Sequence, residues 1–317
     1  MAGPDTRVDR PHTPPCEGGG PGNEADAPVR GAPLSPSAEQ LRRTDRDRFV
    51  LTLLAPPQRR PALFALFAWH VELARVPFMV SDPMAGAVRL QYWHDLVLAD
   101  DPMAAARGHP MAEELATRVL PDLSAKDRGL LVALLEACVE DLPPDPPPDD
   151  AAVLRVADRT SGALSQIAAR LLGVDDPASR AVARHAGTAW GLVALARATP
   201  ALINAGRLRL PVAVVRAAGR EPSTVLAGND TDRHGIRAGV AVLSALAARE
   251  LAQVRAVTGD SGRRLDARVR PLARQAIQAA HGLRTLKRLR YDPYDSRMAA
   301  LRPPLVRLVG DRLIRGA

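Results

Sequence analysis

The sequence predicts an all-α protein that folds as one helical domain. Three observations lead to this fold class. Apolar residues recur at three- and four-residue steps through most of the chain, which is the spacing of one face of an α-helix. No stretch alternates apolar and polar residues as a half-buried strand does. Of the 317 residues, 46% are hydrophobic, which is enough for a substantial core. We expect about nine or ten helices.

The first 40 residues differ in composition from the rest of the chain. They contain eight prolines and six glycines and almost no large apolar residue. Such a segment cannot bury enough surface to offset the entropy lost on ordering. We predict a disordered tail over residues 1–40 and a helical domain over residues 41–317, with Ser37 and Gln40 forming a capping box. Acidic residues scattered through the tail, and its lack of an apolar core, argue against a transit or signal peptide.

The centre of the domain is predicted between residues 60 and 95. Six of the ten aromatic residues of the chain lie there, and aromatic side chains bury the largest areas. Pro61 suits the first turn of a helix. This helix is apolar over most of its circumference, so it belongs inside the bundle. Pro77 kinks or ends it, and a second helix begins after Asp82, with Pro83 in its first turn.

The remaining elements are helices separated by turns rich in proline, glycine and aspartate. A short helix is expected after Pro110, and Ser124 caps an amphipathic helix. The proline-rich segment over residues 142–148 is a stiff connector. Long helices are predicted over residues 149–172, 177–205, 232–258 and 265–289.

The net charge of +8 is concentrated in the C-terminal part of the chain. From Gly262 to the end there are fourteen Arg or Lys residues against four acids. We interpret the basic region 263–315 as a solvated helix face, with an anionic membrane surface or an acidic protein as alternative partners. Nucleic acid is not expected as a partner, because no aromatic residue interrupts residues 263–290.

Cysteine content and hydropathy favour a cytoplasmic protein. Two cysteines cannot form a disulfide framework. The best candidate for a membrane span, residues 186–206, carries Arg197 at its centre. A charge at that depth of a bilayer is costly, so a buried helix is the better interpretation. We expect no signal peptide and no transmembrane helix, with peripheral association at the inner membrane as the alternative.

The sequence contains none of the common catalytic motifs. There is no glycine-rich phosphate loop, no HExxH, no paired CxxC and no nucleophile elbow. His70 and Glu72 stand two residues apart on a helix, which separates them by about 200° and argues against a shared metal ion. Arg75 lies among aromatic residues, where it needs a bound anion or a counter-charge such as Glu72 or Asp95.

Four segments, in this order, resemble the squalene/phytoene synthase family. They are RRPALFALFAWHVELARV, AVRLQYWHDLV, VADRTSGAL and HAGTAWGLVALARATPALINAGRLRLP, and the resemblance spans residues 45–290. It implies a single all-α bundle of the isoprenoid synthase type with a central apolar cavity. Members that catalyse carry two aspartate-rich motifs across this cavity. These carboxylates hold magnesium ions, which neutralise and draw off the diphosphate of a prenyl substrate.

The aspartate positions of both motifs hold other residues in this chain. By alignment, the first motif falls on Ala74, Arg75 and Phe78, and the second falls on Ala198 and Leu202. With at most Glu72 nearby, the magnesium cluster cannot be built, so we expect no metal and no other cofactor. The resemblance also implies further residues of the cavity wall. It implies three arginines that either bind a phosphate or pair with nearby carboxylates. They are Phe67, His70, Glu72, Trp93 and Trp190 for the cavity, and Arg75, Arg197 and Arg207 for phosphate.

The segment VELARV, in place of the first motif, resembles a subgroup that includes a mitochondrial assembly factor for respiratory complex I. We therefore favour a catalytically inactive protein that acts as an assembly factor or as a lipid-binding or protein-binding factor at a membrane surface. Its partners would be respiratory-complex subunits or lipid.

Two enzymatic hypotheses remain as alternatives. One is an active, magnesium-dependent head-to-head prenyl diphosphate synthase acting on farnesyl or geranylgeranyl diphosphate, with a metal site built from Glu72 and other acids. The other is a metal-free reaction on the same bundle. Carboxylates within about 5 Å of each other at the cavity mouth would favour the synthase. An apolar cavity floor would favour binding; its residues would be Ala74, Phe78, Ala198 and Leu202.

Overall fold

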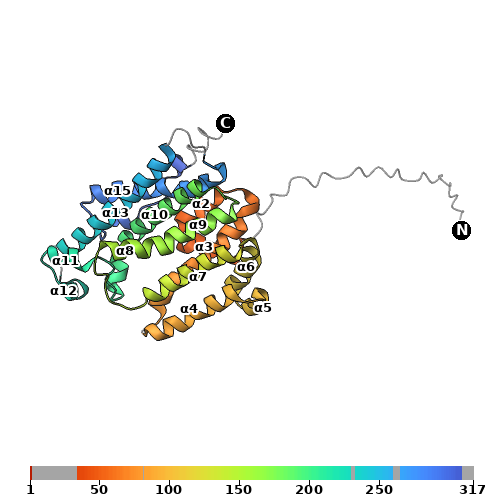
Figure 1. The fold of residues 1–317 in the computed structure, drawn as a ribbon, viewed down its shortest axis with the longest axis horizontal. Helices are drawn as coiled ribbons and strands as arrows, with labels where there is room; N and C mark the ends of the chain where they lie inside the picture. The colour runs from red at the N-terminus through yellow and green to blue at the C-terminus, as the bar shows by residue number, and fades with distance from the viewer. Residues whose placement is uncertain (2–33, 81, 230–232, 260–264, 309–317) are drawn as a thin grey trace. The chain divides into compact units, whose positions relative to one another are not determined.

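The computed structural model describes Met1 and residues 34–80, 82–229, 233–259 and 265–308. These residues form helices and no strand, as the all-α prediction requires (Figure 1). From Leu34 onward the described residues form one unit. Most of the tail predicted to be disordered, residues 2–33, lies outside the described residues.

More helices are present in the described residues than the nine or ten predicted. Prolines in first turns start short additional helices, of which α5 and α12 are examples. The α-helices are α1 (Pro36–Thr44), α2 (Arg46–Leu53), α3 (Arg60–Met79), α4 (Pro83–Leu98), α5 (Pro102–Ala106), α6 (Pro110–Arg118), α7 (Ala125–Glu140), α8 (Asp150–Ala157), α9 (Ala163–Leu171), α10 (Pro177–Asn204), α11 (Val212–Ala217), α12 (Pro222–Leu226), α13 (His234–Gly259), α14 (Arg270–Ala273), α15 (Gln275–Arg288) and α16 (Ser296–Ala299). Four short segments of other helical types are η1 (Pro57–Arg59), η2 (Leu120–Asp122), η3 (Asp158–Gly162) and η4 (Ala267–Val269).

Several predicted helix boundaries need correction. Ser35, rather than Ser37, caps α1, because the Ser35 hydroxyl accepts a hydrogen bond from the Ala38 amide at 3.3 Å. Helix α3 continues for two residues beyond Pro77 before it ends. The single helix predicted over residues 265–289 is divided into η4, α14 and α15. The last division lies at Arg274, whose buried side chain donates to the Leu308 carbonyl at 3.0 Å.

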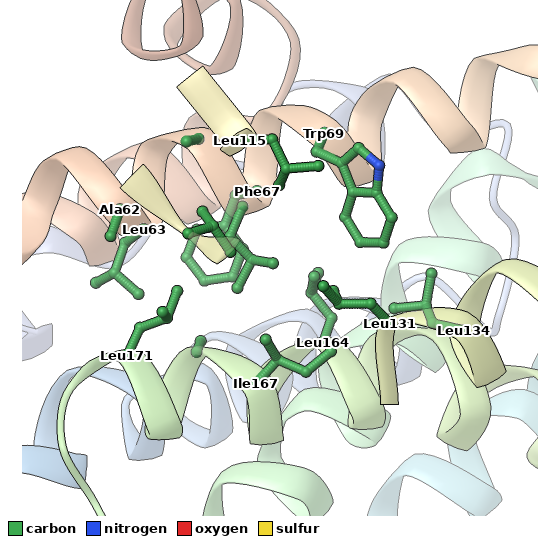
Figure 2. Packing of buried hydrophobic residues seen from close by; sticks show 14 of the residues in the cluster. Ala62, Leu63, Phe67, Trp69, Leu115, Leu131, Leu134, Leu164, Ile167 and Leu171 are labelled. Atoms are coloured by element: carbon green, nitrogen blue, oxygen red, sulfur yellow. The ribbon is translucent and has the colours of Figure 1, made fainter. Parts of the chain in front are cut away.

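Helix α3 is the core helix of the N-terminal half. It packs against α1, α4, α6 and α9, and an unbroken run of its residues from Ala62 to Trp69 is buried. Figure 2 shows Phe67 of α3 across from Ile167 of α9, with Leu131 of α7 beside them. The aromatic-rich segment therefore anchors the largest apolar cluster of the described residues, as its composition predicts.

Helix α10 is the core helix of the second half. It lies between α9 on one side and α13 and α15 on the other (Figure 1). Two glycines let it approach the π-helical η3 closely. A Cβ at Gly187 would lie 2.6 Å from the Ser161 carbonyl oxygen, and one at Gly191 would lie 2.6 Å from the Ser161 Cβ. This contact leaves room for no larger residue at either position, and it fixes η3 against α10.

Two helical stretches of the described residues are long and apolar enough to cross a membrane by length and composition alone. They are Pro57–Met79 and Pro177–Asn204. In the most apolar stretch of each, 56% and 61% of the residues are buried inside the bundle. Core helices of a bundle have the same composition, because they are covered on most sides by other helices.

Replacing Gly187 with alanine is expected to lower the free energy of unfolding by about 1–3 kcal/mol, because the new methyl group overlaps Ser161 and Ser165. Chemical denaturation measures this change. Gly129→Ala is the matched control, since Gly129 lies in α7 with no atom within 4 Å of an added Cβ; it should raise stability by about 0.5–1 kcal/mol. Equal effects of the two substitutions would contradict the close contact between η3 and α10.

Candidate functional site

A cavity of about 470 Å³ lies where α3, η3 and α10 come together. The last turns of α7 and the segment after α10 complete its wall. Most of the lining side chains are apolar, and the charged ones are arginines and aspartates. The lining residues are Thr44, Asp45, Arg48, His70, Val71, Leu73, Ala74, Arg75, Pro77, Phe78, Cys138, Asp141, Pro147, Val153, Val156, Ala157, Thr160, Ser161, Trp190, Gly191, Ala194, Leu195, Arg197, Ala198, Leu202, Arg207 and Arg209.

The positions aligned with the two aspartate motifs line this cavity. Ala74 and Phe78 come from α3, and Ala198 and Leu202 come from α10. Ala74, Phe78 and Ala198 are exposed to solvent, so they lie at the open side of the cavity. Four apolar side chains and Arg75 therefore occupy the places where the resemblance expects magnesium-binding carboxylates.

Three of the predicted cavity residues lie elsewhere. Phe67 faces the apolar cluster around α9 instead. Trp93 packs edge-on against His109, with ring centroids 5.1 Å apart. Glu72 accepts a hydrogen bond from Gln40, away from the cavity wall. The sequence pattern identified α3 and α10 as cavity helices, whereas α4, which carries Trp93, contributes no lining residue. Periodicity alone does not distinguish the face of a helix toward the cavity from the face toward the core.

The three predicted phosphate ligands all line the cavity, and each has a partner within the protein. The Arg75 guanidinium lies 3.5 Å from the Glu72 carboxylate. Arg197 pairs with Asp47 at 3.3 Å. Arg207 donates to the carbonyls of Leu142 and Asp141, at 2.8 and 2.5 Å.

Arg207 and Arg209 hold the proline-rich connector in place. Arg209 donates to the carbonyl oxygens of Asp141, Pro143 and Asp145, at 2.7 Å each. Prolines have no backbone N–H, so the carbonyls of such a segment need donors from outside it. Both arginines therefore have a structural task that the sequence did not reveal.

Arg48 is the central charged group of the site, and sequence analysis missed it. Its side chain is only 3% exposed. It pairs with Asp45 at 3.3 Å and contacts His70 Nδ1 at 3.2 Å. The guanidinium carbon stacks 4.4 Å from the ring centre of Trp190, which is a favourable cation–π distance. Two further nitrogens, Nε and Nη2, are buried without a hydrogen-bond partner among the described residues.

A signal for the burial of Arg48 exists in the sequence. Leu51, Thr52 and Ala55 follow Arg48 at three, four and seven residues, and all four are buried. This is the spacing of one helix face, so Arg48 lies on the apolar side of α2.

His70 is neutral in the folded protein. Burial, and then the charge of Arg48, hold the pKa of His70 well below its ordinary value of 6.5. A guanidinium only donates hydrogen bonds, so Nδ1 of His70 accepts from Arg48 and the ring proton lies on Nε2. Burial also raises the pKa of Cys138 to about 12, so this cavity thiol is not a thiolate nucleophile.

The donor set of the cavity does not fit a magnesium cluster. Two carboxylates line it, and each is paired with an arginine: Asp45 with Arg48, and Asp141 with Arg209 at 3.2 Å. Within the described ranges, no three His, Cys, Asp or Glu side chains are placed to hold one metal ion. Burial raises the pKa of Asp141, which further weakens it as a ligand for a hard cation.

The family model of squalene/phytoene synthases matches residues 41–308 of this chain. The chain belongs to the squalene/phytoene synthase family. Solved structures of this fold include the squalene synthase HpnC from Alicyclobacillus acidocaldarius, with a TM-score of 0.63 and 16% identity over 81% of this chain and 94% of that one. A dehydrosqualene synthase with bound ligand has a TM-score of 0.67 and 13% identity, over 89% of this chain and 96% of that one. At these identities the likeness establishes the fold alone.

Curated relatives of this family member are named NADH dehydrogenase (ubiquinone) complex I, assembly factor 6. The protein from Bos taurus is 31% identical over 55% of this chain and 51% of its own length. The protein from Homo sapiens is 32% identical over 51% of this chain and 48% of its own length. The homolog from Drosophila melanogaster is 29% identical over 53% of this chain and 50% of its own length. The chain therefore spans about half the length of the curated relatives it matches.

Replacing Arg48 with methionine is expected to lower the free energy of unfolding by about 3 kcal/mol, because it leaves the Asp45 carboxylate without its partner. Adding Asp45→Asn, which retains the helix cap, should recover part of this loss in a double-mutant cycle. Arg197→Met is the control. The Arg197–Asp47 pair is more exposed, so its loss should lower the free energy of unfolding by about 1 kcal/mol or less. An Arg48→Met protein as stable as the wild type would contradict the central role of this ion pair.

The neutral, partly buried His70 makes stability depend on pH. In the unfolded chain its pKa returns to 6.5, above the folded value. The unfolded state then binds the extra proton, so the free energy of unfolding falls as the pH drops below about 6.5. His70→Gln should flatten this slope in denaturation curves between about pH 5 and 7. His281, whose pKa is also lowered by burial, contributes to the slope that remains. An unchanged slope in the His70 variant would contradict this account.

Proposed function

We propose that this chain is a catalytically silent member of its family that acts by binding, as an assembly factor for a membrane respiratory complex of the complex I type. One observation carries the proposal. Ala74, Phe78, Ala198 and Leu202 line the cavity, and they are the residues that the family resemblance aligns with the aspartates of catalysing members.

The chemistry of prenyl transfer explains why these four residues matter. Ionising an allylic diphosphate transfers negative charge to the leaving group, and magnesium ions held by carboxylates neutralise that charge. A methyl group or a phenyl ring cannot take the place of a carboxylate. The remaining cavity acids are engaged by Arg48 and Arg209, so the bundle keeps its shape and lacks the groups that the reaction needs.

The names of the curated relatives support the choice of partner. Mammalian and insect relatives are named assembly factors of complex I, a membrane-bound NADH dehydrogenase. We infer that subunits of a respiratory complex are the partners of this chain and that it works at the membrane surface where they are inserted. The cavity, which is mostly apolar, is suited to hold an acyl or prenyl chain during that task.

A strain that lacks this chain tests the assembly role. The amount of assembled NADH dehydrogenase in its membranes, measured by native gel and by NADH oxidation, should fall and should return with the wild-type gene. Glu72→Gln/Asp141→Asn should restore it equally well, because a binding role needs neither carboxylate. The raised pKa of Asp141 indicates that its site tolerates a neutral group.

Two outcomes would count against this proposal. Normal assembly in the deletion strain would remove the respiratory complex as the partner. Failure of the double variant to restore assembly, while the folded protein accumulates to wild-type levels, would favour a catalytic role for these acids.

A further inference from the structure

Four large apolar side chains are exposed at the tip where α3 meets α4. They are Phe78 and Met79 at the end of α3, exposed by 52% each, and Met84 and Val88 in the first turns of α4, exposed by 70% and 66%. Met84 and Val88 are four residues apart, so they share one face of the helix. We call these four residues the apolar tip. Helix α4 lies at an edge of the bundle (Figure 1), and none of the helices described by the structure covers this face.

Among the described residues, α4 packs on the bundle through its opposite face, where Leu90, Trp93, Leu96 and Val97 are buried. Packing within this part of the chain therefore does not explain apolar residues at the apolar tip. Exposed apolar area costs about 25 cal/mol per Å² relative to burial. A contiguous patch of exposed apolar residues therefore indicates a site that binds another protein or a membrane.

The charges around the apolar tip favour an anionic lipid bilayer as its binding partner. Arg75 and Arg89 are both exposed beside it. Arg75 also lies 3.5 Å from the Glu72 carboxylate, but more than half of its side chain is open to solvent, so this pair is a weak, surface one. The exposed acid between the two arginines, Asp82, is engaged in capping α4, where it accepts from the Met84 amide at 2.9 Å. Arginine side chains are long enough to reach lipid phosphates while neighbouring apolar groups enter the acyl region.

The apolar tip is also continuous with the cavity. Phe78 belongs to both, and Pro77 and Arg75 line the cavity beside it. An amphiphile moving from a bilayer into the cavity would therefore pass along apolar side chains and not through water. A surface used only to bind another protein has no need of this continuity.

We propose that the apolar tip docks this chain onto a lipid bilayer with anionic headgroups and turns the mouth of the cavity toward the membrane. The proposal goes beyond the assembly role, and the experiment that tests it uses purified protein without any respiratory subunit. Its failure therefore leaves the assembly role untouched.

The test is sedimentation of the full chain with vesicles of phosphatidylcholine, with and without about 30% phosphatidylglycerol. The wild type should bind the anionic vesicles more tightly. Met84→Glu/Val88→Glu should weaken that binding by about tenfold or more, since two charges are brought into the apolar contact. Both side chains point to solvent, so thermal unfolding of the variant should match the wild type.

Two control variants locate the contact on the surface. Leu98→Glu/Met103→Glu adds the same charge at side chains exposed by 54% and 46%, at the far end of α4 and in the following α5, and should bind like the wild type. Arg284→Glu/Arg288→Glu alters exposed arginines of α15, in the basic region 263–315. This variant should lose less vesicle binding than the tip variant.

Three outcomes would overturn the proposal. The first is no binding of the folded wild type to either vesicle. The second is an equal loss of vesicle binding in the tip variant and in the Leu98→Glu/Met103→Glu control, or a greater loss of binding in the α15 variant than in the tip variant. The third is a dimer in solution that the tip variant converts to a monomer, which would assign this surface to a second copy of the chain.

Discussion

A buried arginine links the parts of the chain that form the cavity. Arg48 extends from α2 to His70 of α3 and to the ring of Trp190 of α10. Burying a guanidinium is costly unless charged and polar groups surround it. Asp45 supplies the counter-charge and the aromatic ring supplies a favourable face. The three helices therefore have to meet in one arrangement, and the cavity opens beside this junction, with η3 and the end of α7 completing its wall.

The same ion pairs set the chemistry of the cavity. In a catalysing synthase, carboxylates on facing helices are left to the metal and the diphosphate. Here Asp47 pairs with Arg197, Asp141 with Arg209, and Asp45 with Arg48. Charges that are balanced inside the protein need no metal. The cavity keeps the apolar wall of the family fold, while its polar groups serve to hold helices and a proline-rich connector.

Much of the fold could be predicted from local pattern. The apolar circumference of α3 and the caps at Asp82 and Ser124 are encoded within a few residues, and the structure has them where the sequence places them. The partners of charged residues could not be predicted in this way. Arg197 meets Asp47 from 150 positions away along the chain. Glu72 stands in the right segment but on the wrong face of α3 to line the cavity.

The most direct test of a silent bundle is a search for the reaction itself. The purified full chain would be incubated with farnesyl or geranylgeranyl diphosphate and magnesium, and the release of inorganic diphosphate would be followed beside an active synthase. A cavity whose motif positions are Ala74, Phe78, Ala198 and Leu202 predicts no release above background from the folded protein. Release that exceeds background and disappears with a chelator would show that this chain builds a metal site from other residues, and it would contradict the account.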